Sequence, residues 1–285
     1  MDEQELQSKY DGLRRLLADL HSVLVAFSGG VDSTLLLRVA ADVLGRQKVI
    51  AGTARCAFVP AHELEDAGEL AREIGVKHRI LDAEVLGDPD IMRNSPDRCY
   101  FCKRVLLAGL KRIAREEGVE GVVEASNLDD AQGDFRPGLR AVEELAVRSP
   151  LREVRMGKAH VRELSRRLGL RTHDRPSSAC LASRIPYGEP ITAEKLERVE
   201  KAEDVLRGMG LRQFRVRSHG HLARIELGPK EDIGALICAR APLTRDLKRL
   251  GYLYVTLDLE GYRMGSMNEA IAAGRLEAGR CTRKR

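Results

Sequence analysis

The chain lacks tryptophan and has few aromatic residues: its six tyrosines and five phenylalanines make up 4% of 285 residues. Proteins that bind single-stranded nucleic acid commonly stack its bases on aromatic side chains and attract its backbone with basic tracts. Here 48 lysines and arginines are interleaved with 43 aspartates and glutamates, so the net charge is only +5. This composition argues against a nucleic-acid partner, whereas a mildly basic surface suits an anionic nucleotide.

Long apolar runs are also absent. No stretch approaches the roughly 20 apolar residues that span a bilayer, and residues 1–5 are acidic and polar, unlike a secretory signal. We therefore expect a cytoplasmic protein without a membrane-spanning segment. In that compartment its six cysteines are expected to be thiols, metal ligands or catalytic groups, and not disulfides.

The order of strand and helix patterns predicts an α/β fold with a parallel sheet covered on both faces. Up to about Pro190, apolar β-rich runs alternate with amphipathic helical patterns: strands at 23–27, 49–53, 76–81 and 121–124, and helices at 3–20, 33–44, 60–74, 101–117, 139–147 and 158–168. We expect one domain over residues 1–188.

The pattern changes after the proline-rich stretch 176–190. An amphipathic helix that begins at Thr192, a hairpin of 213–217 and 223–227, helices at 229–239 and 243–250 and a strand at 252–257 predict a smaller α+β domain over 189–285. We expect this second domain to serve substrate binding or oligomerisation.

The most informative segment is Ser28-Gly29-Gly30-Val31-Asp32-Ser33, which follows the first strand and opens a helix. Two glycines allow a tight turn with its N–H groups aligned, and the helix adds the positive end of its dipole. A phosphate site is therefore expected. It is not the loop that ends in Gly-Lys-Ser/Thr, because no lysine follows the glycines. The simpler interpretation is a glycine turn that only packs a helix on a strand.

This loop resembles the pyrophosphate loop (PP-loop) of the ATP pyrophosphatases, which cleave ATP between its α- and β-phosphates. The resemblance implies that Ser28, Gly29, Gly30, Asp32 and Ser33 bind ATP. If the loop holds the β- and γ-phosphates as the leaving group, the α-phosphorus stays open to attack by a substrate oxygen.

Cys99 and Cys102 lie three positions apart at the start of a predicted helix. Thiols at this spacing can ligate one metal or cluster, and flanking basic residues favour the thiolate. A redox pair or a chance spacing fits the same pattern.

Cys180 lies on a loop between prolines, with arginines on either side. A loop cysteine near cations is suited to react as an anion, although a half-buried structural cysteine is also typical of such a position.

Polar residues follow the fourth predicted strand, in the segments 127–130 and 134–138. Carboxylates such as Asp130 can hold Mg²⁺ on a triphosphate, Asn127 can contact the nucleotide, and Arg136 can hold a substrate acid. A solvated acidic turn is the alternative.

Taken in order, these motifs resemble the LarE family of pyridinium-3,5-biscarboxylic acid mononucleotide sulfurtransferases, which act in nickel-pincer nucleotide (lactate racemase cofactor) biosynthesis. The resemblance covers about residues 10–270 through SGGVDS, NSPDRCYFCK, NLDD, DFRPG, VRSPL, ACLASRIPYG, FRVRSHG, ARIE and LDLEGYRMGSMNE. It implies an enzyme that adenylates a pyridinium carboxylate with ATP and Mg²⁺ and then replaces AMP with sulfur.

The resemblance gives two sources for the sulfur. Family members with one active-site cysteine, here matched by Cys180, give up that sulfur and keep dehydroalanine. Members with three cysteines hold a [4Fe–4S] cluster, and this sequence has that pattern in Cys99, Cys102 and Cys180. Three protein ligands leave one iron open for a sulfide, so we expect repeatable sulfur transfer through the cluster.

The resemblance also implies substrate-binding residues and a quaternary structure. It places Ser183, Arg184, Arg215 and Arg217 at the substrate, with the arginines of the predicted hairpin on its phosphate. Glu203 and Glu226 become candidates for an acid or metal site between subunits, and the family forms hexamers. A solvated, salt-bridged strand face is the simpler interpretation of these charges.

One segment departs from the family pattern: Glu124-Ala125-Ser126 stands where Asp-Gly-Thr is expected. An alanine in place of glycine narrows the backbone conformations of that turn, so local nucleotide contacts are expected to differ. Cys56, Cys238 and Cys281 match no motif; we expect Cys238 in the core and Cys281 in the tail.

Two other functions compete with a cofactor-building enzyme. A tRNA thiolase uses the same loop and sometimes three cysteines, but its partner calls for the basic tract and stacking aromatics that are missing here. A nucleotide-sensing module would bind ATP without releasing pyrophosphate.

Overall fold

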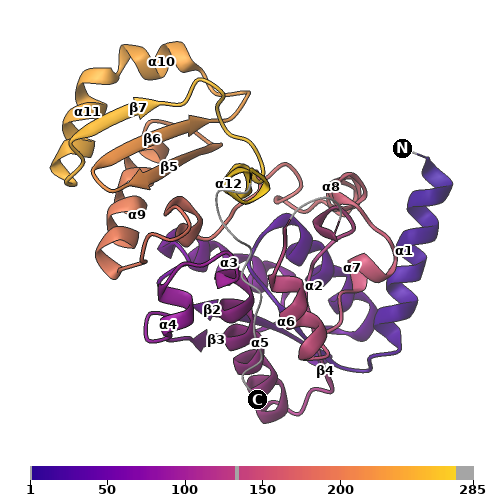
Figure 1. The fold of residues 1–285 in the computed structure, drawn as a ribbon. Coiled ribbons are helices and arrows are strands. Elements are labelled where there is room, and N and C mark those ends of the chain that lie inside the picture. The colour runs from indigo at the N-terminus through magenta and orange to yellow at the C-terminus, as the bar shows by residue number, and fades with distance from the viewer. Residues whose placement is uncertain (1, 132–134, 274–285) are drawn as a thin grey trace. The chain divides into compact units, whose positions relative to one another are not determined.

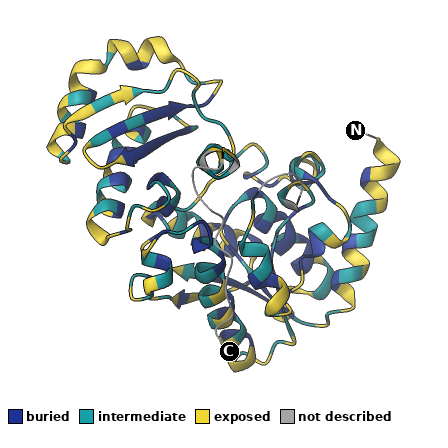
Figure 2. Ribbon diagram, viewed as in Figure 1, coloured by how far each residue is buried: buried dark blue, intermediate teal, exposed yellow. Residues whose placement is uncertain are grey.

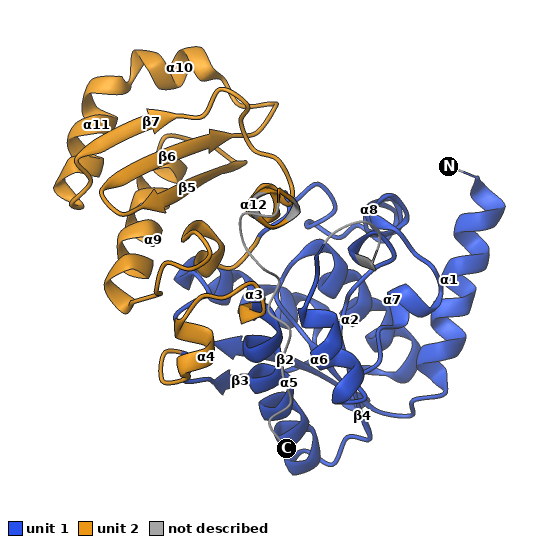
Figure 3. Ribbon diagram, in the orientation of Figure 1, with its two compact units in different colours: residues 1–85, 99–178 blue, residues 86–98, 179–285 orange. Residues whose placement is uncertain are grey.

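The computed structural model describes residues 2–131 and 135–273, which form two compact units. Unit 1 consists of residues 1–85 and 99–178, and unit 2 of residues 86–98 and 179–285 (Figure 3). Residues 86–98 and 179–188, which precede the predicted domain boundary, thus belong to unit 2.

Unit 1 contains a four-stranded parallel sheet in the order β3-β2-β1-β4, so the first strand is an inner one (Figure 1). Its elements are α1 (Glu3–Ala18), β1 (Val23–Ala26), α2 (Val31–Leu44), η1 (Arg46–Lys48), β2 (Val49–Arg55), α3 (Ala61–Ile74), β3 (Lys77–Asp82), α5 (Arg98–Glu116, from residue 99 on), β4 (Gly121–Val123), η2 (Asp129–Ala131), α6 (Gly138–Glu144), α7 (Pro150–Glu153) and α8 (Lys158–Arg167).

Burial on alternate faces of the inner strand produces a three-layer arrangement. Val23 and Val25 of β1 belong to a core that includes buried residues of α1, α2, α3 and α8. Leu24, between them, belongs to a second core that includes buried residues of α5 and Val142 of α6. Because successive side chains of a strand point to opposite faces, helices cover the sheet on both sides. Figure 2 shows the inner strands β1 and β2 as mostly buried.

The predicted fold of unit 1 is confirmed, and the differences lie at element ends. The helix expected from residue 101 begins at Arg98, so both cysteines lie within it. The helix expected to reach 147 ends at Glu144, where Ala146 adopts a left-handed conformation with φ 50°. The short helix α7, with Pro150 in its first turn, was not predicted.

Unit 2 contains a three-stranded sheet in the order β5-β6-β7, with an antiparallel β5–β6 hairpin and a parallel β6–β7 pair. Its elements are α4 (Pro89–Met92), η3 (Leu181–Arg184), α9 (Ala193–Gly208), β5 (Phe214–His219), β6 (Leu222–Leu227), α10 (Ile233–Cys238), α11 (Arg240–Arg249), β7 (Tyr254–Leu257), η4 (Ser266–Asn268) and α12 (Glu269–Ala272). The predicted hairpin and amphipathic helix are confirmed.

The core of unit 2 forms where helices pack on one face of this sheet. Ala202 and Leu206 of α9 meet alternate residues of the hairpin, such as Val216 and Ile225, and α11 adds Leu247. The helix predicted at 229–239 is shorter because Asp232 caps it by accepting a hydrogen bond from the Ala235 amide.

Asn94 holds a loop of unit 2 in place. It is fully buried and adopts φ 55°. Its side-chain Nδ2 donates to the carbonyls of Ile185, Pro186 and Glu189 at 3.3, 2.7 and 2.9 Å. The segment before α5 therefore fixes the backbone that follows Cys180 in the chain.

His78 of β3 makes the stability of unit 1 depend on pH. Its Nε2 lies 2.8 Å from Thr53 Oγ1, and burial lowers the pKa of the ring below 6.5. The unfolded chain therefore binds the proton more readily, and stability is lost as the pH falls through about 6.5. We predict that this loss is smaller in His78→Gln than in the parent chain, measured by urea unfolding between pH 7.5 and 5. His221→Gln, at an exposed position, should leave the profile unchanged; equal profiles for all three proteins would contradict the assignment.

Candidate functional site

The loop Ser28–Ser33 joins β1 to α2 and turns through Gly29, whose φ is +70°. A Cβ at Gly29 would lie 3.4 Å from Ala67 Cα in α3, so both conformation and space favour glycine. Ser33 stabilises the turn: its hydroxyl donates to the Gly30 carbonyl at 3.2 Å and accepts from the Ser28 amide at 3.3 Å. The expected loop between a strand and a helix is present.

Asp32, in the first turn of α2, is the point at which three segments meet. Its Oδ1 accepts a hydrogen bond from Asn127 Nδ2 at 2.9 Å, and its other oxygen forms an ion pair with Lys158. The segment after β4 and the start of α8 are thereby joined to the loop. The structure brings together the predicted residues Asp32 and Asn127.

The turn after β4 is held by its own polar groups. Asn127 donates its amide to Asp130 Oδ2 at 3.0 Å, and its side-chain oxygen accepts from the amides of Asp129 and Asp130 at 2.9 and 3.3 Å. Arg136 lies 3.2 Å from Asp130, so its guanidinium faces this turn. The predicted Asn127, Asp130 and Arg136 therefore form one cluster in unit 1.

Lys158 is a site residue that the sequence analysis missed. It begins α8, and its amide donates to Asp129 Oδ2 at 2.7 Å. A Cβ on the preceding Gly157 would lie 2.8 Å from Asp129 Oδ1, so glycine permits this close approach. The sequence analysis gave residue 158 only as the start of a predicted helix, and no local pattern indicated its contact with Asp32.

Arg175, one of the arginines that flank Cys180 in the sequence, contacts loop 28–33. It donates to the Gly29 carbonyl at 2.9 Å and forms an ion pair with Asp66 of α3. The Arg175 carbonyl in turn accepts from Arg162 at 2.7 Å. Arg162 thereby fixes the backbone of the residue that supports the Gly29 turn.

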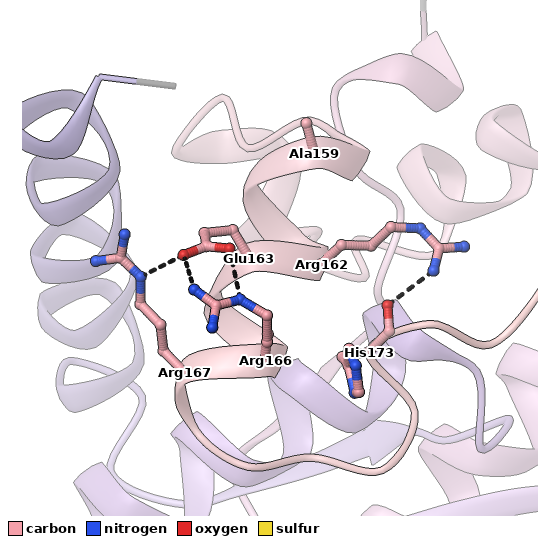
Figure 4. Close-up of a pocket in the computed structure, with 6 residues that line it drawn as sticks. All are labelled: Ala159, Arg162, Glu163, Arg166, Arg167 and His173. Carbon is pink, nitrogen blue, oxygen red and sulfur yellow. Dashed lines mark hydrogen bonds and ion pairs between the residues drawn. The ribbon is translucent and has the colours of Figure 1, made fainter.

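Arg162 also lines a cavity of about 360 Å³ on α8. Figure 4 shows Glu163 between Arg166 and Arg167, and Arg162 directed to the His173 carbonyl, 2.8 Å away. Hydrogen bonds from Arg166 and Arg167 lower the pKa of Glu163 to about 2. The basic groups of this cavity are thus engaged by a carboxylate and by carbonyls.

Cys99 and Cys102 occupy the first turns of α5 and are half-buried. The neighbouring cations have other contacts. Lys103 forms an ion pair with Glu124 at 2.8 Å, and the Arg104 guanidinium lies 5.5 Å from the centre of the Tyr100 ring. The cysteines share one side of the helix because they are three residues apart.

Cys180 precedes η3 in unit 2 and is half-buried. Its carbonyl accepts from the Ser183 amide at 2.9 Å and from Arg184 Nη1 at 3.1 Å. Arg184 also donates to Ser183 Oγ at 3.0 Å. The predicted residues Cys180, Ser183 and Arg184 therefore share one turn.

Arg184 forms a bidentate ion pair with Glu203 of α9, at 2.8 and 2.9 Å. Both side chains are at most 5% exposed. Burial raises the pKa of Glu203, but the charge of Arg184 and its hydrogen bonds outweigh this effect, so the pKa lies below its ordinary value. Glu203 Oε1 also accepts from the Val216 amide at 3.0 Å, which connects α9 to β5.

A second buried pair lies in the hairpin. Arg217 of β5 binds Glu226 of β6 at 3.0 and 2.9 Å and donates to the Ser183 carbonyl at 2.7 Å. Arg215 is 7% exposed, and its guanidinium lies 4.9 Å from the centre of the Tyr262 ring. The predicted hairpin charges are thus packed inside unit 2.

Among the described residues, 2–131 and 135–273, no group of three or more His, Cys, Asp and Glu side chains is arranged to hold a metal ion. Cys99 and Cys102 on α5 therefore have no third ligand of these types arranged beside them among the described residues of unit 1. The described residues contain no helix long and apolar enough to cross a membrane.

Two residues of the sequence analysis, Asp134 and Cys281, lie outside the described residues. Cys238, which was expected in the core, is exposed on α10.

The fold and the loop define the class of protein. A parallel sheet with Ser-Gly-Gly-Val-Asp-Ser between its inner strand and a helix is an α/β PP-loop domain. The NAD synthase family model matches residues 5–88, which contain this loop.

Two relatives span nearly the whole chain. An uncharacterized protein of Synechocystis sp. is 44% identical over 93% of this chain and 99% of its own length. The pyridinium-3,5-bisthiocarboxylic acid mononucleotide synthase of Lactiplantibacillus plantarum is 39% identical over 95% of this chain and 98% of its own. The chain therefore belongs to the LarE family, as its motifs predicted.

A more distant relative represents the competing function. The tRNA-specific 2-thiouridylase MnmA of Xanthobacter autotrophicus is 28% identical over 64% of this chain and 55% of its own length. This lower coverage is consistent with a shared PP-loop domain.

The burial of the Arg184–Glu203 pair predicts a large difference between two arginine substitutions. Arg184→Met leaves an unpaired buried carboxylate and should lower the free energy of unfolding by about 3 kcal/mol. Arg207→Met removes an ion pair with Asp204 in which both side chains are more than a third exposed and should cost less than about 0.5 kcal/mol. Urea unfolding of the whole chain measures both, and equal losses would contradict a structural role for the buried pair.

Proposed function

We propose that this protein is an ATP-dependent sulfurtransferase that converts a carboxylate of pyridinium-3,5-biscarboxylic acid mononucleotide to a thiocarboxylate. The observation that carries the proposal is the match to the bisthiocarboxylic acid mononucleotide synthase, which covers 98% of that relative. The geometry of loop 28–33, with its serines, glycine turn and helix start, supports ATP as the activating substrate.

Activation begins with the substrate carboxylate. One of its oxygens attacks the α-phosphorus of ATP, the bond to the bridging oxygen breaks, and pyrophosphate leaves. The residues of unit 1 would bind the triphosphate: the loop from Ser28 to Ser33 on the β- and γ-phosphates, Asn127 on the nucleotide, and Asp32 and Asp130 on Mg²⁺. Arg136, which lies beside Asp130, would hold the substrate acid.

Sulfur then replaces AMP at the acyl carbon, since an acyl adenylate has a stable leaving group. In the sacrificial route the Cys180 thiolate forms a thioester, and AMP departs. Loss of the Cα proton and cleavage of the Cβ–S bond then release the thiocarboxylate and leave dehydroalanine. Cys180 is the cysteine of the motif ACLASR, and the family resemblance assigns this step to it.

The source of sulfur that we favour is a [4Fe–4S] cluster ligated by Cys99, Cys102 and Cys180, and the sacrificial route is its alternative. When bound, such a cluster would supply an open iron site able to hold an extra sulfide. The three-cysteine pattern of the sequence supports this part of the proposal, and the pairing of Cys99 with Cys102 on one helix is compatible with it.

Unit 2 would serve the substrate. Ser183 is hydrogen-bonded to both Arg184 and Arg217, and Arg215 is buried on the same strand as Arg217. These four residues would act at the mononucleotide, partly by fixing the turn after Cys180. We further propose that residues 1–188 form the ATP-binding domain and that residues 189–285 form a domain for substrate binding or oligomerisation.

The protein is proposed to be a cytoplasmic hexamer. Glu203 and Glu226 would contribute to a site between its subunits.

The proposed reaction predicts which substrate stimulates pyrophosphate release. The pyridinium biscarboxylate mononucleotide should raise release from ATP at least tenfold, because adenylation needs its carboxylate, and transfer RNA should have no effect. Cys180→Ser should keep this stimulation but form no thiocarboxylate, whereas Cys238→Ser should behave as the parent. A continuous pyrophosphate assay and mass spectrometry of the product measure the two steps.

The same experiment separates the competing functions. Stimulation by transfer RNA alone would support a thiolase, and ATP binding without pyrophosphate release would support a sensor. The mass of the protein after one anaerobic turnover, together with its iron and sulfide content, distinguishes the two sulfur sources. A loss of roughly one H₂S at Cys180 identifies the sacrificial route.

Lys158 adds a prediction about ATP affinity. Its ammonium is bound to Asp32 within the phosphate loop, so a triphosphate at this loop would meet it. Lys158→Met should weaken ATP binding about tenfold, the value of one charge-assisted hydrogen bond, but change AMP binding less than twofold, because AMP has no β- or γ-phosphate. Lys77→Met, which removes an ion pair with Glu117, is the control. Isothermal calorimetry of the parent and variant proteins measures the affinity for both nucleotides. If Lys158→Met weakened the binding of ATP and AMP equally, a contact of Lys158 with the β- or γ-phosphate would be ruled out.

A further inference from the structure

Glu124 is a buried carboxylate that directly follows β4, in the segment that departs from the family pattern. It is 5% exposed. It accepts hydrogen bonds from Lys103 Nζ at 2.8 Å, from the Ser126 amide at 3.1 Å, from Ser126 Oγ at 2.7 Å and from Ser149 Oγ. Four donors from three segments of unit 1 therefore converge on one side chain.

These contacts keep Glu124 ionised. Burial raises its pKa, but the Lys103 ammonium and the hydroxyls of Ser149 and Ser126 outweigh burial and hold the pKa below its ordinary value. A buried carboxylate with these partners cannot lose one of them without a large penalty. Its position and that of its partners are therefore strongly coupled.

On one side, Glu124 is connected to loop 28–33 through a chain of hydrogen bonds. It fixes both the amide and the hydroxyl of Ser126, and the next residue is Asn127. The Asn127 side chain donates to Asp32 in the first turn of α2. A ligand that displaces Asp32 or Asn127 must therefore act on the turn that Glu124 holds.

On the other side, Glu124 is connected to the helix turn that carries two cysteines. Lys103 follows Cys102 in α5, and its side chain, 31% exposed, reaches across to the carboxylate. A Cβ on Gly138 would lie 3.2 Å from Lys103 Cδ and 3.6 Å from the Cys99 carbonyl oxygen. The start of α6 thus packs against this same turn and leaves Lys103 little freedom.

We propose that Glu124 and Lys103 are a positioning pair that couples nucleotide occupancy of loop 28–33 to the turn of α5 bearing Cys99 and Cys102. The pair touches neither nucleotide nor reacting atoms and acts through Asn127 on one side and through helix α5 on the other. The aspartate expected at this position has a side chain one methylene shorter, so the glutamate extends further toward Lys103 and Ser149. The inference rests on the proposed function only in that ATP binds the loop.

Hydrogen–deuterium exchange of the full chain tests this coupling. In the parent protein, Mg²⁺ and a non-hydrolysable ATP analogue should slow amide exchange severalfold in peptides covering residues 98–108. Lys103→Met should abolish this effect while the affinity for the analogue stays within twofold. Glu124→Asp, which keeps the charge but shortens the side chain, should reduce the effect in the same way.

Lys111→Met is the matched control, because Lys111 lies two turns further along α5 and donates to the Leu145 carbonyl at 2.6 Å. It should leave both the affinity and the slowed exchange unchanged. Melting temperatures of all variants identify any general loss of structure. Such a loss would raise amide exchange both with and without nucleotide, so it can be told apart from a loss of the coupling.

The outcomes separate this inference from the proposed function. Three results would each overturn the coupling and leave the sulfurtransferase proposal intact: a parent protein that binds the analogue without slower exchange in α5, a Lys103→Met protein that keeps the slowing, or a Lys103→Met protein whose affinity for the analogue falls more than twofold. A parent protein that binds no ATP analogue would overturn both.

Discussion

The carboxylate of Asp32 is the group on which the arrangement of unit 1 depends. It lies in the first turn of α2 and binds Asn127 from the segment after β4 and Lys158 from the start of α8. Asn127 and Lys158 lie 95 and 126 residues from Asp32 in the chain. The pairing of β4 with β1 brings the segment of Asn127 to the same edge of the sheet as the loop. Carboxyl ends of adjacent parallel strands are where open α/β sheets bind ligands.

Unit 2 contains ionic interactions of a different kind. The pairs of Arg184 with Glu203 and of Arg217 with Glu226 are nearly inaccessible to solvent. Such pairs contribute less to net stability than to the choice of one conformation, because isolated charges inside a protein are very unfavourable. Here they define the turn that begins at Cys180, since Arg184 and Arg217 both donate to backbone carbonyls within it.

Much of the fold could be predicted because its signals are local. The apolar run 23–27, the glycine loop and the helix after it are contiguous, and the structure confirms all three. The four strands were found from short apolar runs, and their parallel pairing follows from the intervening helices. Helix ends were less certain: α6 ends early at a left-handed residue, and α10 begins only after the Asp232 cap.

The site was predictable where chemistry and spacing coincide, as in Ser28–Ser33 and Cys99 with Cys102. Lys158, Arg175 and Glu124 were not predicted as partners, because a lysine, an arginine or a glutamate has no local pattern that reveals a distant contact. Glu124 was noticed only as a departure from the family pattern, and its four donors give that departure a structural reason.

The sequence by itself determined the PP-loop class, the LarE family and the residue types available for chemistry, because each of these depends on short contiguous motifs. Only the tertiary structure decided which charges meet: Lys158 with Asp32, Arg175 with the Gly29 carbonyl and Lys103 with Glu124. The physical reason is that an ion pair needs two groups within a few ångströms, and folding brings together residues that the linear order keeps far apart.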